Sequence, residues 1–247
     1  DLERQGGADH IVVAGDLFTF CAAPNEVLAR LRKLRRACFL LGNTDRYLLE
    51  GTYPSTEGSG GWQEMLLYSF QWTAEQVGRE GLHFLEAVPS YQVITHGQRQ
   101  LLAVHGSPKS DEEGLTVETE ASEFESMPIG AKVAVLACGH THVPMARTVG
   151  GVCVVNVGSV GLPFDGDPRA CYAIVSSLAA NGTGPTQVEL RRVAYDVERA
   201  IEQFYDRDHP AADIGAYNLR TARSIGTSLI YTPEMRCRSK TAAVEEW

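Results

Sequence analysis

The segment VLACGHTHVP, Val135 to Pro144, runs from apolar residues directly into two histidines, His140 and His142. An apolar run of this length is typical of a buried β-strand. Gly139 and Pro144 flank the histidines and favour a turn that brings both imidazoles to one site at the strand end. The segment therefore predicts a sheet whose strands deliver polar side chains to one edge.

Other apolar runs end in polar residues in the same way. HIVVAGD ends at Asp16, CFLLGNTD contains Asn43 and Asp45, and LLAVHGSP contains His105. The first two runs flank PNEVLARLRKLRRA, residues 24–37, whose apolar spacing and N-terminal proline predict a helix. Strand, helix and strand in this order indicate a βαβ unit and a parallel sheet, whose carboxyl ends converge on one crevice.

The converging side chains define a class of site. Carboxylate and amide oxygens are mixed with three imidazoles, and no thiolate is among them. This donor set favours Mn²⁺, Fe or Zn²⁺ over a sulfur-rich or a purely oxygen-ligated site. Each motif alone is weak, because a Gly-Asp pair is common and a single histidine such as His105 is usually hydrogen-bonded in a core or loop. The four motifs in this order are much less expected by chance.

Length, charge and cysteine content limit the classes of protein to which the chain can belong. The 247 residues, 44% of them hydrophobic, can fill one sizeable core, and no linker divides them, so we expect a single domain over 1–247. A net charge of −9 argues against a stable nucleic-acid or anionic-membrane partner. Six scattered cysteines without a C-x-x-C pair, and no span-length apolar run, predict a cytoplasmic protein that acts on a small molecule.

The rest of the chain yields coarser expectations. Residues 51–61 read as a surface loop, 62–78 as a helix, and 91–105 as two strands. The acidic stretch 111–125 reads as a solvated face, and residues 196–207 as a helix. We expect MARTV, VCVVNVGS, ACYAIVS and TQVELRRV to form a second, antiparallel or mixed sheet, and residues 208–247 to be a helical or loosely ordered tail.

Taken together, the motifs resemble the calcineurin-like metallophosphoesterases, within their small bacterial and archaeal phosphodiesterase-like branch. The resemblance spans residues 12–193 and rests on VAGDL, LLGNTD, VHGSP, CGHTHVP and NVGSVGLPFDGDPRACYAIV. It implies an α/β fold, a four-layer α/β/β/α sandwich of two mixed sheets. It also implies two divalent metal ions, with Mn²⁺ preferred and Fe, Zn²⁺ or Ni²⁺ as alternatives, which hold a bridging hydroxide for direct attack on phosphorus.

The resemblance also implies roles for individual residues. Asp16 would bridge the two metals, Asn43, His105 and His140 would complete the shell of one, and His142 would bind the other. Asn43 and Thr44 would additionally bind the substrate phosphate, and Asn43 would take part in catalysis. Asp45 would support catalysis from behind the site.

Two features depart from the family pattern. The family opens with Asp-x-His one βα unit before Gly-Asp, and no such motif precedes Asp16 here. We therefore expect the given sequence to lack the first strand and most of the first helix, with Asp-x-His upstream of Asp1; a truncated domain is the alternative. Thr44 also replaces a histidine that would protonate the leaving group, which favours substrates with good leaving groups.

These features predict a metal-dependent phosphoesterase that hydrolyses phosphodiesters or nucleoside polyphosphates. A general phosphomonoesterase is weaker because of Thr44. A non-catalytic binding scaffold on the same fold, like the scaffold subunit of the retromer coat, is the alternative from another class, but a decayed site has no reason to retain three histidines. Assembly into a homo-oligomer is left open.

Overall fold

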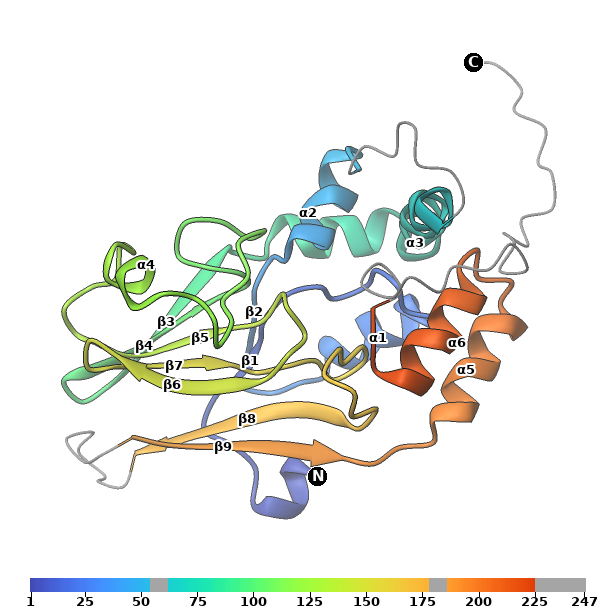
Figure 1. The fold of residues 1–247 in the computed structure, drawn as a ribbon. Coiled ribbons are helices and arrows are strands. Elements are labelled where there is room, and N and C mark those ends of the chain that lie inside the picture. Colours follow the sequence, from blue (N-terminus) through green and yellow to red (C-terminus); the bar gives the residue numbers. More distant parts are fainter. Residues whose placement is uncertain (54–61, 178–185, 225–247) are drawn as a thin grey trace.

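The computed structural model describes residues 1–53, 62–177 and 186–224 (Figure 1). Its largest sheet has the strand order β3-β4-β5-β7-β6, in which β4, β5 and β7 are parallel and the two outer strands are antiparallel to their neighbours. The strands are Tyr91–His96 (β3), Arg99–Val104 (β4), Val133–Cys138 (β5), Met145–Val149 (β6) and Val152–Asn156 (β7). The chain is therefore a mixed α/β protein, as the sequence predicted.

The N-terminal βαβ unit is confirmed. After a short 3-10 helix at Leu2–Gln5, strands β1 (Ile11–Val13) and β2 (Ala37–Phe39) pair in parallel across α1 (Pro24–Leu31). Pro24 occupies the first helical position, where its missing N–H costs nothing. The helix ends six residues before the predicted Ala37, because the chain must turn back toward β2.

Helix α2 (Asn43–Glu50) was not among the predicted elements. The helix begins immediately after β2, and the Asp45 carboxylate accepts a hydrogen bond of 3.0 Å from the backbone N–H of Gly42. This cap satisfies one of the free N–H groups at the helix start. Asn43 and Thr44 are consequently held in the first turn of a helix.

Helix α3 (Trp62–Glu86) is longer than the predicted 62–78, although Gly78 does interrupt it with φ 54° and ψ −161°. The helical path resumes because residues on both sides of the break, Val77 and Leu85, are buried in the same apolar cluster under β1 and β2. The predicted loop 51–61 lies outside the described residues beyond Tyr53.

The predicted second sheet is wrong in its membership. β6 and β7 belong to the five-stranded sheet, where β7 already has β5 on one side and β6 on the other. This leaves no edge of β7 for the later strands. Strands β8 (Ala170–Ser177) and β9 (Thr186–Val193) pair with each other and, among the described strands, with no other. Figure 1 shows this pair lying against the five-stranded sheet.

Helices cover the remaining surfaces. A short helix α4 (Ala121–Glu125) interrupts the acidic stretch and buries Phe124 against the five-stranded sheet. The predicted helix 196–207 is α5 (Val197–Asp206), and the tail adds α6 (Ala212–Thr221). α5 and α6 pack on each other beside α1 (Figure 1). Within the described residues, no helix is long and apolar enough to cross a membrane.

Candidate metal centre

Two glycines allow the loops after β1 and β2 to touch. A Cβ atom on Gly42 would lie 2.4 Å from the backbone nitrogen of Asp16, and one on Gly15 would lie 2.5 Å from Nδ1 of His105. Gly15 also has φ +89°, which favours glycine. Glycine is therefore required at positions 15 and 42, because the loops after β1 and β2 approach each other too closely for a side chain. This approach places Asp16 beside Asn43 and Thr44.

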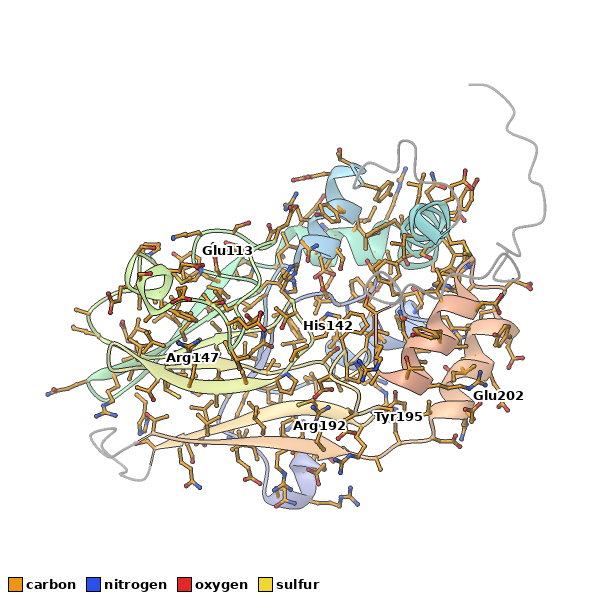
Figure 2. All side chains as sticks on the ribbon, viewed as in Figure 1. Glu113, His142, Arg147, Arg192, Tyr195 and Glu202 are labelled. Carbon is orange, nitrogen blue, oxygen red and sulfur yellow. The ribbon has the colours of Figure 1, made fainter. Side chains whose placement is uncertain are left out.

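The Gly-His-Thr-His segment turns at the end of β5, as predicted. Both His140 (φ 63°) and His142 (φ 58°) adopt the left-handed region, which costs of the order of 1 kcal/mol or more for a residue with a side chain. Such outliers persist where surrounding contacts fix them. Here they aim both imidazoles at the Asp16 loop, and Figure 2 shows His142 in the middle of the molecule, at the strand ends.

Asn156, the last residue of β7, supplies those fixing contacts. Its fully buried amide donates hydrogen bonds of 2.7 Å to the Gly139 carbonyl and 2.9 Å to the Thr141 hydroxyl. Its oxygen accepts from the backbone N–H of Gly158 at 3.1 Å. Asn156 was not among the predicted site residues, although a polar residue at the end of an apolar strand was a signal for a role there.

The predicted ligands converge. The Asn43 amide oxygen lies 3.0 Å from Nε2 of His105 and 3.2 Å from Nδ1 of His140. The Asp16 carboxylate lies 3.5 Å from Nε2 of His105 and 3.6 Å from Nε2 of His142. Side chains from four separate segments thus meet at one point.

Backbone carbonyls fix the orientation of two of these imidazoles. Nδ1 of His105 donates to the Ala14 carbonyl at 2.6 Å, and Nδ1 of His142 donates to the Leu162 carbonyl at 2.6 Å. In the neutral rings, each Nε2 then carries a lone pair, and these lone pairs face the oxygens of Asn43 and Asp16. Acceptors that face acceptors in a buried site need a cation between them or a proton on the ring.

The donor spacings fit a divalent metal ion. Two ligands about 2.0–2.2 Å from one ion lie about 3.0–3.6 Å apart when they subtend right or tetrahedral angles, and the four spacings above fall in this range. Oxygen and imidazole donors suit Mn²⁺, Fe and Zn²⁺. In the described part of the chain no group of three or more His, Cys, Asp or Glu side chains is arranged to hold a metal by itself. The contacts above instead centre on Asn43, which belongs to none of those residue types.

Electrostatics keep the Asp16 carboxylate ionised. Burial alone would raise its pKa, but hydrogen bonding to His142 and the charge of His105, each in its protonated form, hold the pKa well below its usual range. Burial, followed by the charge of His105, lowers the pKa of His140. A charged carboxylate and neutral imidazoles are the forms that bind a metal.

The other two predicted residues lie behind this cluster. Asp45 is fully buried, and its carboxylate accepts from the backbone N–H groups of Leu17 and Gly42 at 2.8 and 3.0 Å, tying the two loops together. Burial and the charge of Asp16 raise its pKa to about 8. Thr44 donates its hydroxyl to Asp16 at 2.7 Å. The catalytic role of Asp45 and the substrate-binding role of Thr44 stay predictions.

The chain is similar to known proteins over most of its length. Residues 1–178 match the calcineurin-like phosphoesterase superfamily domain. The chain belongs to this superfamily. It is 25% identical over 217 residues to MJ0912, an uncharacterized protein of Methanocaldococcus jannaschii, a match that covers 81% of the chain and 82% of the relative.

Two solved structures are similar over most of their length. A metallophosphoesterase from Sphaerobacter thermophilus has a TM-score of 0.67 and 25% identity, with 89% of this chain and 91% of the other covered. The hypothetical protein PH1004 from Pyrococcus horikoshii has a TM-score of 0.72 and 20% identity, with 90% and 89% covered. The second likeness shows the shared fold alone.

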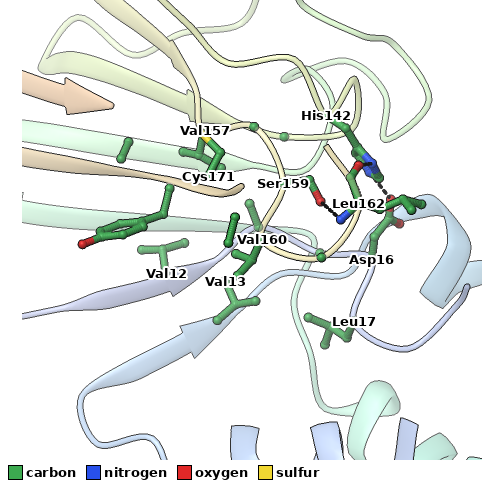
Figure 3. Close-up of a pocket in the computed structure, with 18 of the residues that line it drawn as sticks. Val12, Val13, Asp16, Leu17, His142, Val157, Ser159, Val160, Leu162 and Cys171 are labelled. Atoms are coloured by element: carbon green, nitrogen blue, oxygen red, sulfur yellow. Dashed lines mark hydrogen bonds and ion pairs between the residues drawn. The ribbon is translucent and has the colours of Figure 1, made fainter. Parts of the chain in front are cut away.

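The histidine cluster opens onto a long apolar groove. Its volume is about 2180 Å³, and it continues from the histidine cluster between β1 and β8 to α5 and α6. Figure 3 shows Val12 and Val13 of β1 on one wall and Cys171 of β8 on the other, with Asp16 and His142 at the end.

Proposed function

We propose that this phosphoesterase is a metal-dependent hydrolase of phosphodiesters or nucleoside polyphosphates. The observation that carries the proposal is that Asp16, Asn43 and the Nε2 lone pair of His105 face one another as acceptors, with His140 beside them, at spacings that suit one ion. A binding scaffold would gain nothing from a buried arrangement of this kind, which costs stability without a cation.

The protein's residues would have distinct duties. Asp16 and Asn43 would hold one ion with His105 and His140, and His142 would bind the second. Thr44 would keep the Asp16 carboxylate aimed through its 2.7 Å hydrogen bond. Bound divalent ions would lower the pKa of a water molecule and neutralise charge on the phosphate oxygens. We expect Mn²⁺ to serve, with Fe, Zn²⁺ or Ni²⁺ as alternatives.

The Thr44 side chain supports the proposed preference for phosphodiesters and nucleoside polyphosphates. Its hydroxyl is not an acid near neutral pH, and its proton already goes to Asp16. Leaving groups that need a proton would therefore depart slowly, whereas aryl esters and anhydrides would depart without one. This favours diesters and nucleoside polyphosphates over alkyl monoesters.

A second ion needs more ligands than Asp16 and His142. We propose that a further β-strand bearing Asp-x-His, N-terminal to Asp1, occupies the groove between β1 and β8. Among the described strands, β1 pairs only with β2 and β8 only with β9, so each presents an unpaired edge to the groove. Isolated two-stranded pairs are marginal, and free edges accept strands.

Unpaired polar atoms support the same occupant. In the described chain, Oγ1 of Thr19, Nε2 of His209 and Oδ1 of Asn218 are buried without a hydrogen-bond partner. All three residues line the groove. Because buried polar groups are nearly always paired, a segment packed into the groove, with small shifts of the side chains that now cover these atoms, would satisfy them. A protein carrying the residues before Asp1 should bind two Mn²⁺ and unfold at a higher temperature than the 247-residue chain.

A substrate panel tests the proposed function. Bis(p-nitrophenyl) phosphate, a nucleoside triphosphate and an alkyl phosphate monoester are each incubated with the protein in Mn²⁺ and in excess chelator. We expect metal-dependent turnover of the first two at rates well above the monoester. Equal rates would contradict the substrate class, and no turnover of any of them would favour the scaffold.

A further inference from the structure

We infer that Tyr47 and Glu112 are positioning residues that fix the orientation of the Asn43 side-chain amide, so that its oxygen and not its nitrogen faces the metal. This inference rests on the proposed metal-dependent function. Asn43 and Tyr47 are four residues apart on α2, which places both side chains on one face of the helix.

An asparagine side chain can bind a metal ion in only one of the two orientations of its amide. One end of its amide is an oxygen that can bind a cation, and the other is an NH₂ group that repels one. Rotation by 180° exchanges the two ends at almost no steric cost. His105 and His140 both contact the oxygen end, so something on the other side must hold the NH₂ group.

The charge of Glu112 determines which group donates in the hydrogen bonds that lead through Tyr47 to Asn43. Oε1 of Glu112 lies 2.6 Å from the Tyr47 hydroxyl and 2.7 Å from Nη2 of Arg46. Bonds from Tyr47 and Arg46 lower the pKa of Glu112, so its carboxylate is ionised and can only accept. The Tyr47 hydroxyl must therefore donate its single proton to Glu112.

The hydroxyl then has only lone pairs for its other neighbour. Asn43 lies one helical turn before Tyr47 on the same face of α2, and hydrogen bonding from Asn43 counteracts the rise that burial causes in the pKa of Tyr47. Because the hydroxyl proton goes to Glu112, the donor toward the hydroxyl must be the Asn43 amide NH₂. The amide oxygen is consequently directed to His105 and His140. The negative charge of Glu112 thus sets the direction of the whole chain.

The ring of Tyr47 is held firmly enough for this task. It packs edge-on against Phe70 at 5.8 Å, and the Arg46 guanidinium lies 4.9 Å from its centre. Arg46 is itself bound by Asp111 at 2.7 Å as well as by Glu112. The loop that carries Glu112 is in this way fixed to α2.

A double-mutant cycle on the 247-residue chain tests the inference, with Mn²⁺ binding measured by titration calorimetry. Tyr47→Phe keeps the ring and removes the hydroxyl. We expect it to weaken Mn²⁺ binding by about 10- to 100-fold, as loss of an orienting partner of a metal ligand does. In an Asn43→Asp background, whose carboxylate has an oxygen at each end, the same change should cost less than about 3-fold.

Two further variants sharpen the test. Tyr53→Phe is the matched control, because Tyr53 also stacks on Phe70, at 5.1 Å, and should leave Mn²⁺ binding unchanged. Glu112→Gln retains an acceptor for the Tyr47 hydroxyl and should lose less affinity than Glu112→Ala.

The possible results separate the inference from the proposed function. An equal loss from Tyr47→Phe in both backgrounds, or no loss in either, would overturn the inference while the metal site stands. A wild-type chain that binds no Mn²⁺ would overturn the proposed function as well.

Discussion

The side-chain amide of Asn156 donates a hydrogen bond of 2.7 Å to the carbonyl oxygen of Gly139, one residue before His140. The end of β7 thereby holds the loop that carries two of the three converging imidazoles. Because Asn156 is fully buried, its partners have no water to replace it.

Asn156→Leu should therefore destabilise the protein. The N–H of Gly158 would be left unpaired and the carbonyl of Gly139 would keep only its bond from the Thr141 N–H, at a cost of about 1–3 kcal/mol in the free energy of unfolding. Urea denaturation measures this. The control is Asn25→Leu at an exposed position, expected within about 0.5 kcal/mol of wild type. Equal stabilities of the two variants would contradict the role of Asn156.

Gly42→Ala should separate the two metal-binding loops. The added methyl group would lie 2.4–2.5 Å from Asp16, and overpacking of this kind costs about 1–3 kcal/mol. We expect both lower stability and weaker Mn²⁺ binding. Gly130→Ala is the matched control, since its nearest neighbour would be 3.9 Å away. A Gly42→Ala variant that binds Mn²⁺ like wild type would show that the close approach is unnecessary.

Thr44→His should act selectively on substrates. A histidine at this position can protonate a leaving group, so hydrolysis of an alkyl phosphate ester should rise by at least about 10-fold relative to an aryl ester. Thr44→Val, which has no titrating group, controls for the lost hydrogen bond to Asp16. Steady-state rates on both esters decide the matter, and a uniform change would refute the explanation of substrate preference.

His209 should make stability depend on pH. Burial lowers its pKa to about 4, whereas an unfolded histidine titrates near 6.5. The unfolded state therefore binds more protons between these values, and stability is lost as pH falls from about 6.5 toward 4. Between pH 7.5 and 5, wild type should lose about 2 kcal/mol more than His209→Asn. Urea denaturation at both pH values checks this, with exposed His83→Asn, expected to follow wild type, as control.

The residues that converge could be found in the sequence because each belongs to a short motif at the end of an apolar strand. Each predicted ligand lies one to four residues after an apolar strand, so the carboxyl ends of the strands bring Asp16, His105 and His140 together. The partners that hold the ligands were harder to foresee. The Leu162 carbonyl reaches His142 across 20 residues and Glu112 reaches Tyr47 across 65, and neither segment carries a local signal.

The fold was predictable in class and less so in pairing. Hydrophobic patterns indicated strands at β6 to β9, but they do not record which edges are already taken. β7 lies between β5 and β6, and this placement, not the pattern, excludes β8 as a neighbour of β7. Helix α2 was missed because its start depends on a cap from Asp45, which the sequence presented as a residue of the metal site.

Hydrolysis by this phosphoesterase is proposed to need a metal ion that Asp16 holds. The most direct measurement is hydrolysis of bis(p-nitrophenyl) phosphate in Mn²⁺ and in excess chelator, for wild type, Asp16→Asn and the exposed control Asp9→Asn. The account predicts turnover by wild type and Asp9→Asn that chelator abolishes, with a loss of at least about 100-fold in Asp16→Asn. Turnover that survives either chelator or Asp16→Asn would contradict it.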